Sequence, residues 1–285
     1  MSQESILIDI FCLVVFFILG TIFGSFACCQ AWRIRYEEQK KKPLGKWSVC
    51  LSCGKRLKPI ENIPIFSWLI QKGKCKKCGA KIGKAEILSE LSLALAFVAI
   101  SLSILPEIFQ SKSVLLTATL IVMLILLFII TTIMWILMIY DAKWHLLPTR
   151  LLTLVNILAA IYCGLGFLKL SLTSNALAND FLPALANLVG GVALLAGIYF
   201  LLYFFSKEKW VGSGDWLLAL AISLVLGNLW LSLLVLFLSN FLASIVGLRA
   251  KVKKGTRTIP FGPFLVIAFV IVYSLQAWLT GLVVI

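Results

Sequence analysis

Charged residues are scarce in this chain, and acidic residues are fewer than half as many as basic ones. Only 13% of its 285 residues are charged, with 12 Asp and Glu against 26 Lys and Arg, and the chain has a single histidine. Hydrophobic residues, by contrast, make up 61%. Such a composition leaves little material for a soluble domain and is typical of polytopic membrane proteins.

Apolar runs of about 17–25 residues, long enough to cross a bilayer as helices, occur about eight times. They lie near 6–28, 87–105, 113–140, 151–168, 183–205, 216–227, 229–248 and 262–284. The first is too long for a signal peptide and is followed by basic residues, so we expect a retained helix. The sequence therefore predicts an all-α polytopic membrane protein with about eight transmembrane helices, of which the sixth is short.

The basic residues gather on one side of these expected spans. Of the 26 Lys and Arg, all but Lys112 and Lys169 lie in 33–84, 141–150, 206–215 and 249–260. The positive-inside rule places those loops in the cytoplasm and both termini outside. The net charge of +14 is thus a signal of topology and of attraction to anionic membrane lipid. No groove-reading motif accompanies it, so we expect no binding to nucleic acid.

The one large loop carries two Cys-x-x-Cys pairs, Cys50 with Cys53 and Cys75 with Cys78, separated by 21 residues. Four thiolates at this spacing suit a tetrahedral zinc site. Two disulfides are the alternative, but the loop is expected on the reducing side of the membrane. We therefore predict a structural Zn²⁺ in a zinc-ribbon-like cytoplasmic loop, which the metal helps to fold.

Two aspartates stand where long apolar runs meet short polar loops. Asp141 directly follows the third expected span, and Asp215, which closes Gly212-Ser213-Gly214-Asp215, directly precedes the sixth. A carboxylate beside a membrane span is costly to desolvate, which marks it as a candidate functional group. Both are expected at the same membrane face. A pair of carboxylates suits the general acid and base of an aspartic protease. Gly212 and Gly214 would leave room there for an extended substrate backbone.

Structural roles are the alternative for each of these acids. Asp215 could cap its helix, and Asp141 could pair with Lys143 or Arg150. His145, four residues after Asp141, could be a general base or a metal ligand, but a lone interfacial histidine is predicted to be structural. Glu90, on one helical face with Glu86, could be functional or simply favoured at a helix N-terminus.

These residues together resemble the type IV prepilin peptidases, a family of membrane aspartic enzymes. Six motifs carry the resemblance over nearly the whole chain. They are Gly24-Ser25-Phe26 with Arg33, the two cysteine pairs with the intervening Glu61 to Leu69, Glu90-Leu91, Asp141 with Leu146-Leu147-Pro148, Gly212 to Asp215, and Ile259 to Phe264. Thr149 and Cys28 depart from the family pattern, which commonly has Asp and Asn at those positions.

The resemblance implies cleavage of the basic leader of prepilins or pilin-like proteins by Asp141 and Asp215, in a bacterial inner membrane with the site at the cytoplasmic face. It also implies methylation of the new N-terminus with S-adenosylmethionine as donor, and assigns Gly24, Ser25, Arg33 and Glu90 to a substrate or methyl-transfer region. The expected parts are a first helix (1–32), a four-cysteine zinc loop (33–86) and a peptidase core (87–285).

Two other classes of function compete with a peptidase. An ion- or proton-coupled transporter could use Asp141 and Asp215 as carriers, but it predicts acids near mid-span and an internal repeat. A membrane scaffold could dock partners through its zinc ribbon, but it leaves the acid pair unexplained.

Overall fold

The computed structural model describes residues 3–40, 47–50, 52–111, 113–174, 177–208, 211–253 and 260–276. Lys112, Ile259 and the last part of the final expected span, 277–284, lie outside these residues. The described residues fold into helices joined by turns, with two isolated β-bridges and no extended strand among them.

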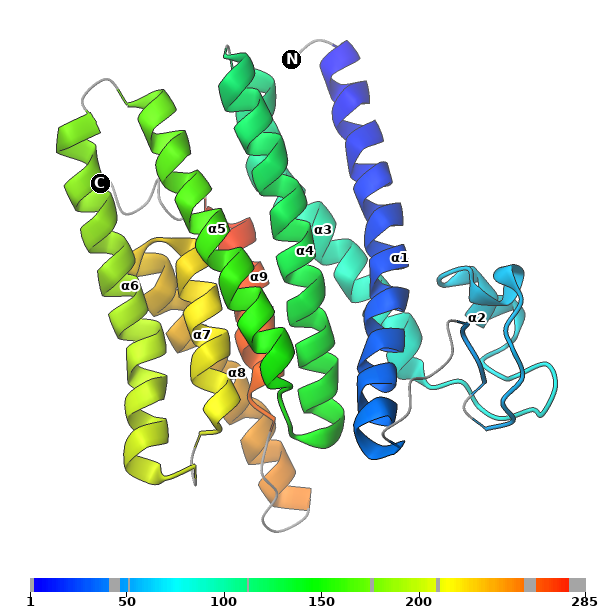
Figure 1. Ribbon diagram of the computed structural model, residues 1–285. Coiled ribbons are helices and arrows are strands. Elements are labelled where there is room, and N and C mark those ends of the chain that lie inside the picture. Colours follow the sequence, from blue (N-terminus) through cyan, green and yellow to red (C-terminus); the bar gives the residue numbers. More distant parts are fainter. Residues whose placement is uncertain are drawn as a thin grey trace. The chain divides into compact units, whose positions relative to one another are not determined.

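The described helices follow the predicted spans (Figure 1). In chain order they are α1 (Gln3–Lys40), η1 (Pro59–Asn62), α2 (Phe66–Ile70), α3 (Lys84–Gln110), α4 (Val114–Trp144), α5 (Thr149–Thr173), α6 (Leu177–Ser206), α7 (Ser213–Leu226), α8 (Leu229–Lys253) and α9 (Gly262–Ser274). Six of them, α1, α3, α4, α5, α6 and α8, are long and apolar enough to cross a membrane, while α7 and α9 are apolar but shorter. The prediction of an all-α polytopic membrane protein is confirmed, with the sixth expected span and the described part of the eighth present as shorter helices.

The chain divides into two compact units, Met1–Ser101 and Leu102–Ile285, with the division inside α3. The three-part domain organisation expected from the sequence stays a prediction. In the first unit α1 packs directly on α3. A Cβ added at Gly20 would lie 2.4 Å from Cα of Ala94, and one at Gly24 would lie 2.6 Å from Cα of Glu90. Only glycine allows the two backbones to come this close.

In the second unit α4 is the most buried of the long helices. It packs against α5 and α9, while α7 packs against α5 and α6. The residues of α4 are apolar on all sides of the helix, as expected of a helix that lies inside a bundle. Its fully buried side chains include Leu127, Ile130, Met134, Leu137 and Tyr140.

The ends of these helices are set by local chemistry. His145 adopts the left-handed conformation (φ 54°) and closes α4, its N–H donating to the Asp141 carbonyl at 2.8 Å. Pro148 then begins α5 as its N-cap, and Gly212 does the same for α7. The C-terminus of α4 and the N-termini of α7 and α9 lie at the same end of the second unit (Figure 1).

Candidate functional site

Asp141 lies in the last turn of α4 and is buried, with 6% of its surface exposed. Its Oδ2 accepts a hydrogen bond of 2.9 Å from the backbone N–H of Gly262, the first residue of α9. A Cβ at position 262 would lie only 2.9 Å from that oxygen. The missing side chain therefore lets the α9 N-terminus, which favours negative charge, reach the carboxylate.

Asp215 lies in the first turn of α7 and is similarly buried, at 9% exposed. Its Oδ2 accepts a hydrogen bond of 3.0 Å from the backbone N–H of Gly212. Gly212 is the N-cap of α7, so Asp215 is the third residue of the helix and caps it by reaching back, as in a capping box. Capping and a catalytic role are compatible, because the cap fixes the position of the carboxylate.

The structure brings the two predicted acids together. Both belong to the second unit, and the carboxyl groups of Asp141 and Asp215 interact electrostatically. Gly214 makes this approach possible, because a Cβ there would lie 2.6 Å from Cβ of Leu147 in the turn that follows α4. Gly212 and Gly214 thus position the acid pair through a cap and a close contact.

Two contributors to this site were not identified as such from the sequence. Gly262 lies within the closing motif, but its role as a donor to Asp141 depends on the fold. Tyr199 of α6 is 2% exposed and packs its ring 5.2 Å from that of Phe261, the N-cap of α9. Nothing in the apolar run around Tyr199 distinguishes it from a core aromatic residue.

His145 has a different position from the acids. Its side chain is exposed, and its backbone forms the C-cap of α4. This arrangement agrees with the structural role predicted for the lone histidine.

The four cysteines of the loop converge. Their Sγ atoms all lie within 4.8 Å of one another, and Cys50 Sγ is 3.9 Å from Cys78 Sγ. Tetrahedral zinc with Zn–S bonds of about 2.3 Å requires sulfurs about 3.8 Å apart. The two halves of the site have the same fold, with Gly54 and Gly79 at positive φ (67° and 69°) after the second cysteine of each pair. The donor set therefore fits a closed structural zinc site.

The clustered cysteine thiols and nearby backbone N–H groups shift the pKa values of the cysteines. Backbone N–H groups of Cys78 and then Lys77 lower the pKa of Cys75 to about 6. A backbone N–H of Ala80 lowers the pKa of Cys78, but desolvation and hydrogen bonds with the other three thiols outweigh it and raise that pKa to about 11. Clustered thiolates repel one another until a cation neutralises them, which is the condition that a bound Zn²⁺ meets.

Glu61 connects the first cysteine pair to the rest of the loop. It is 8% exposed, forms an ion pair of 2.7 Å with Lys55 and accepts a hydrogen bond of 3.0 Å from the backbone N–H of Lys58. The hydrogen bond from Lys55 and then that from Lys58 lower the pKa of the Glu61 carboxyl. Glu61 is therefore a stabilising carboxylate of the zinc loop.

Glu90 holds the same loop to α3. Its Oε2 accepts a hydrogen bond of 2.6 Å from the backbone N–H of Ile65, and its carboxylate also bonds to Ser25. Ile65 has φ 62° and ψ −56°, and the N–H of Phe66 donates to the carbonyl of Pro64 at 2.6 Å. These values describe a γ-turn, which is strained for a β-branched residue.

The predicted substrate or methyl-transfer residues all belong to the first unit, which also holds the zinc loop. Gly24 accepts a hydrogen bond of 2.9 Å from Ser89 Oγ at its contact with α3, and Arg33 is half-buried on α1. The contacts of Gly24 and Glu90 join α1, α3 and the loop.

Comparison with known proteins agrees with this architecture. The family model "Bacterial Peptidase A24 N-terminal domain" matches residues 18–104. The prepilin leader peptidase/N-methyltransferase of Dichelobacter nodosus is 30% identical over 267 residues, covering 88% of this chain and 79% of that protein. The chain belongs to the prepilin leader peptidase/N-methyltransferase family.

Two further members of the family are similar to the chain over most of its length. The protein of this name from Vibrio cholerae is 29% identical over 270 residues, covering 92% of this chain and 96% of its own length. That from Pseudomonas aeruginosa is 31% identical over 226 residues, covering 78% and 69%. No match was found among solved structures. Membership of this family and the six long apolar helices together identify a multi-pass membrane protein.

Proposed function

We propose that this chain is a membrane aspartic endopeptidase that removes the basic leader of type IV prepilins or pilin-like proteins. The observation that carries the proposal is the pairing of Asp141 with Asp215. Both are buried, they interact electrostatically, and each is held by a backbone N–H of a glycine. The names of the relatives supply the class of substrate.

Peptide hydrolysis follows from an acid pair of this kind. Two neighbouring carboxyl groups do not readily ionise together, so one is protonated while the other is charged. The charged group takes a proton from water as the water oxygen attacks the scissile carbonyl carbon, and the protonated group donates its proton to the carbonyl oxygen. The C–N bond then breaks as the leaving amine receives a proton from the pair. The fixed glycine N–H donors keep both carboxylates oriented through these transfers.

The proposed topology places this chemistry at the cytoplasmic face of the bacterial inner membrane, with both termini outside. The basic loops support it through the positive-inside rule. A substrate with a basic leader followed by an apolar helix would lie with its helix in the bilayer and its scissile bond at the level of the acids.

A transporter that uses the same acids is less well supported. Asp141 lies in the last turn of α4 and Asp215 in the first turn of α7. A carrier site is expected near the middle of the membrane instead.

Structural Zn²⁺ and N-methylation complete the proposal. Zinc bound by Cys50, Cys53, Cys75 and Cys78 would hold the two halves of the loop together, and with four thiolates it has no open position for substrate. The support for methylation of the new N-terminus comes from the names of the relatives. Gly24 and Glu90 are engaged in contacts within the protein, so we assign them to the support of the first unit.

The test is cleavage by the purified full-length chain in phospholipid vesicles. A prepilin with its leader, and the same pilin without it, are incubated with and without S-adenosylmethionine and analysed by mass spectrometry. We expect one cut at the end of the leader, and a methyl group on the new amine only when the donor is present. An intact prepilin would contradict the peptidase, and a cut but unmodified product would contradict methylation alone.

A further inference from the structure

The second unit contains a pocket of about 340 Å³ far from the acid pair. It is lined by α4 at Leu120 and Met123 and by the C-terminal end of α7, which stops at Gly227 in the left-handed conformation (φ 58°). Met123 precedes Asp141 by 18 residues on α4, a distance of about 27 Å at 1.5 Å per residue. The pocket is thus near the opposite end of the unit, beside the point where α7, with only 14 residues, ends.

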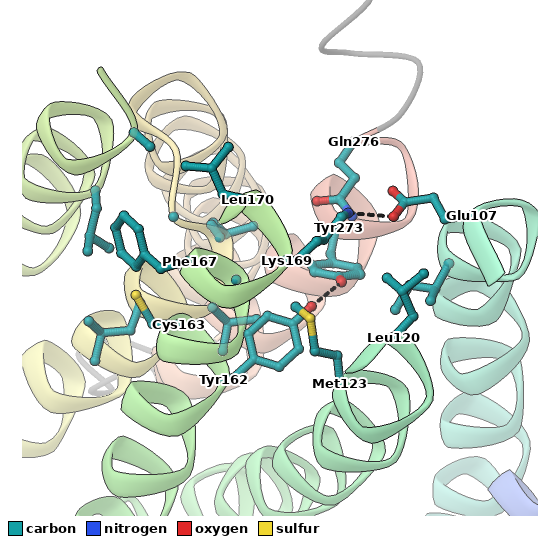
Figure 2. A pocket seen from close by; sticks show the side chains of 18 of the residues that line it. Glu107, Leu120, Met123, Tyr162, Cys163, Phe167, Lys169, Leu170, Tyr273 and Gln276 are labelled. Carbon is teal, nitrogen blue, oxygen red and sulfur yellow. Dashed lines mark hydrogen bonds and ion pairs between the residues drawn. The ribbon is translucent and has the colours of Figure 1, made fainter. Parts of the chain in front are cut away.

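The pocket combines an apolar interior with charges at one side (Figure 2). Lys169 of α5 forms an ion pair with Glu107 of α3, and their side chains are 34% and 47% exposed. The hydroxyls of Tyr162 and Tyr273 share a hydrogen bond of 2.6 Å and are buried. The apolar lining includes Ile104, Leu120, Met123, Phe167, Leu188 and Leu224.

We infer that this pocket binds a phospholipid whose headgroup carries both a phosphate and a primary ammonium. One acyl chain would fill the apolar interior, where its carbon atoms would make van der Waals contacts with the lining side chains. The phosphate would bind Lys169 and the ammonium would bind Glu107, replacing their mutual ion pair by charge-assisted hydrogen bonds.

The position of the charges supports this occupant. Glu107 is three residues from the end of α3 (Gln110), and Lys169 is four from the end of α5 (Thr173). Charged side chains near the ends of spans lie at the level of lipid headgroups. An anionic phospholipid would bring its charge against Glu107, whereas a headgroup with both charges complements both residues.

Two glycines of α5 provide a matched pair of variants. Gly166 lines the pocket, and a Cβ there meets no atom within 4 Å, so Gly166→Leu would fill the cavity without displacing neighbours at Cβ. Gly164 has the same open space but is exposed and does not line the pocket. Gly164→Leu therefore makes the same chemical change on the same helix and leaves the pocket open.

The experiment uses the full-length chain in vesicles of phosphatidylethanolamine and phosphatidylglycerol, with a small fraction of a phosphatidylethanolamine that carries a photoactivatable acyl chain. Labelled peptides are located by mass spectrometry. We expect saturable labelling near Tyr162–Thr173 and Leu224–Gly227, displaced by unlabelled phosphatidylethanolamine. Gly166→Leu should lower it about tenfold, because the filled cavity removes the apolar contacts of the chain, and Gly164→Leu should keep it.

The headgroup is tested with the ion pair. Glu107→Gln leaves Lys169 as the cation, so competition should shift in favour of phosphatidylglycerol, whereas the unsubstituted chain should prefer phosphatidylethanolamine. Equal competition by the two lipids in both proteins would overturn the headgroup assignment. Labelling that does not saturate, or that is equal in the two leucine variants, would show ordinary surrounding lipid and overturn the site. Should Gly166→Leu fail to fold, the presence or absence of saturable labelling in the unsubstituted chain still tests the lipid site.

Discussion

Gly262 is the residue on which the position of Asp141 depends most directly. A Cβ at Gly262 would lie 2.9 Å from Asp141 Oδ2, the movable end of a side chain. Gly262→Ala should therefore displace the carboxylate at little cost in folding. We predict that prepilin cleavage falls by about 10²-fold, the cost of moving a catalytic group by about 1 Å, while the unfolding temperature stays close to that of the unsubstituted chain.

The control for that substitution is Gly164→Ala, where the added Cβ meets nothing within 4 Å. It should keep full cleavage activity. Cleavage by Gly262→Ala at the same rate as the control would show that the contact between α9 and Asp141 does not position the acid.

Glu61 offers a second prediction at the scale of one residue. Because its partners lower its pKa, Glu61 stabilises the folded loop fully above the ordinary Glu pKa of about 4.3, and this contribution is lost as the pH falls through the lowered value. At neutral pH, Glu61→Gln should release zinc to a chelator several-fold faster than the unsubstituted chain. Glu37→Gln, at an exposed acid at the end of α1, should not.

Measuring unfolding at several pH values tests whether the Glu61 carboxylate stabilises the loop in its charged form. The stability difference between the Glu61→Gln variant and the unsubstituted chain should be largest at neutral pH and shrink in acid. A difference that grows as the pH falls would contradict the role given to the Glu61 carboxylate.

At the scale of elements, the contact between α1 and α3 is the most sensitive to substitution. A Cβ at Gly24 would lie 2.6 Å from the backbone of Glu90, and backbone cannot move aside as a side-chain end can. Gly24→Ala should destabilise the protein by about 1–3 kcal/mol, as overpacked sites do. Gly164→Ala, in open space, should instead gain about 0.5–1 kcal/mol, since Ala is the better helix former. Thermal unfolding in detergent measures both, and unchanged stability in Gly24→Ala would refute the close packing.

Helix positions could be predicted because the length of each apolar run can be counted in the sequence. The ends of α4 and α7 are marked by His145-Leu146-Leu147-Pro148 and Gly212-Ser213-Gly214, which are local signals. The final expected span, 262–284, begins at the predicted residue with α9, and its residues 277–284 lie outside the described part of the chain.

At the scale of the whole molecule, the candidate site was predictable where composition made residues conspicuous. Asp141 and Asp215 stand out because acids are rare, and the cysteines because their spacing is regular. Tyr199 and the N–H of Gly262 could not be found in this way. Their roles arise from contacts between α6, α7, α9 and the end of α4, which only the fold brings together. The pocket has the same origin, since its lining residues come from α3, α4, α5, α6, α7 and α9.

We propose that Asp141 and Asp215 together hydrolyse the leader bond, and this is tested most directly by the cleavage rates of Asp141→Asn and Asp215→Asn in vesicles. Asp180→Asn, at an exposed acid in the first turn of α6, is the matched control. We predict that each of the first two loses about 10²–10⁴-fold in rate, the usual contribution of a general acid or base, with unchanged zinc content and abundance, while the control retains full activity. A rate near that of the unsubstituted chain in either variant would remove that residue from the pair and contradict an aspartic mechanism.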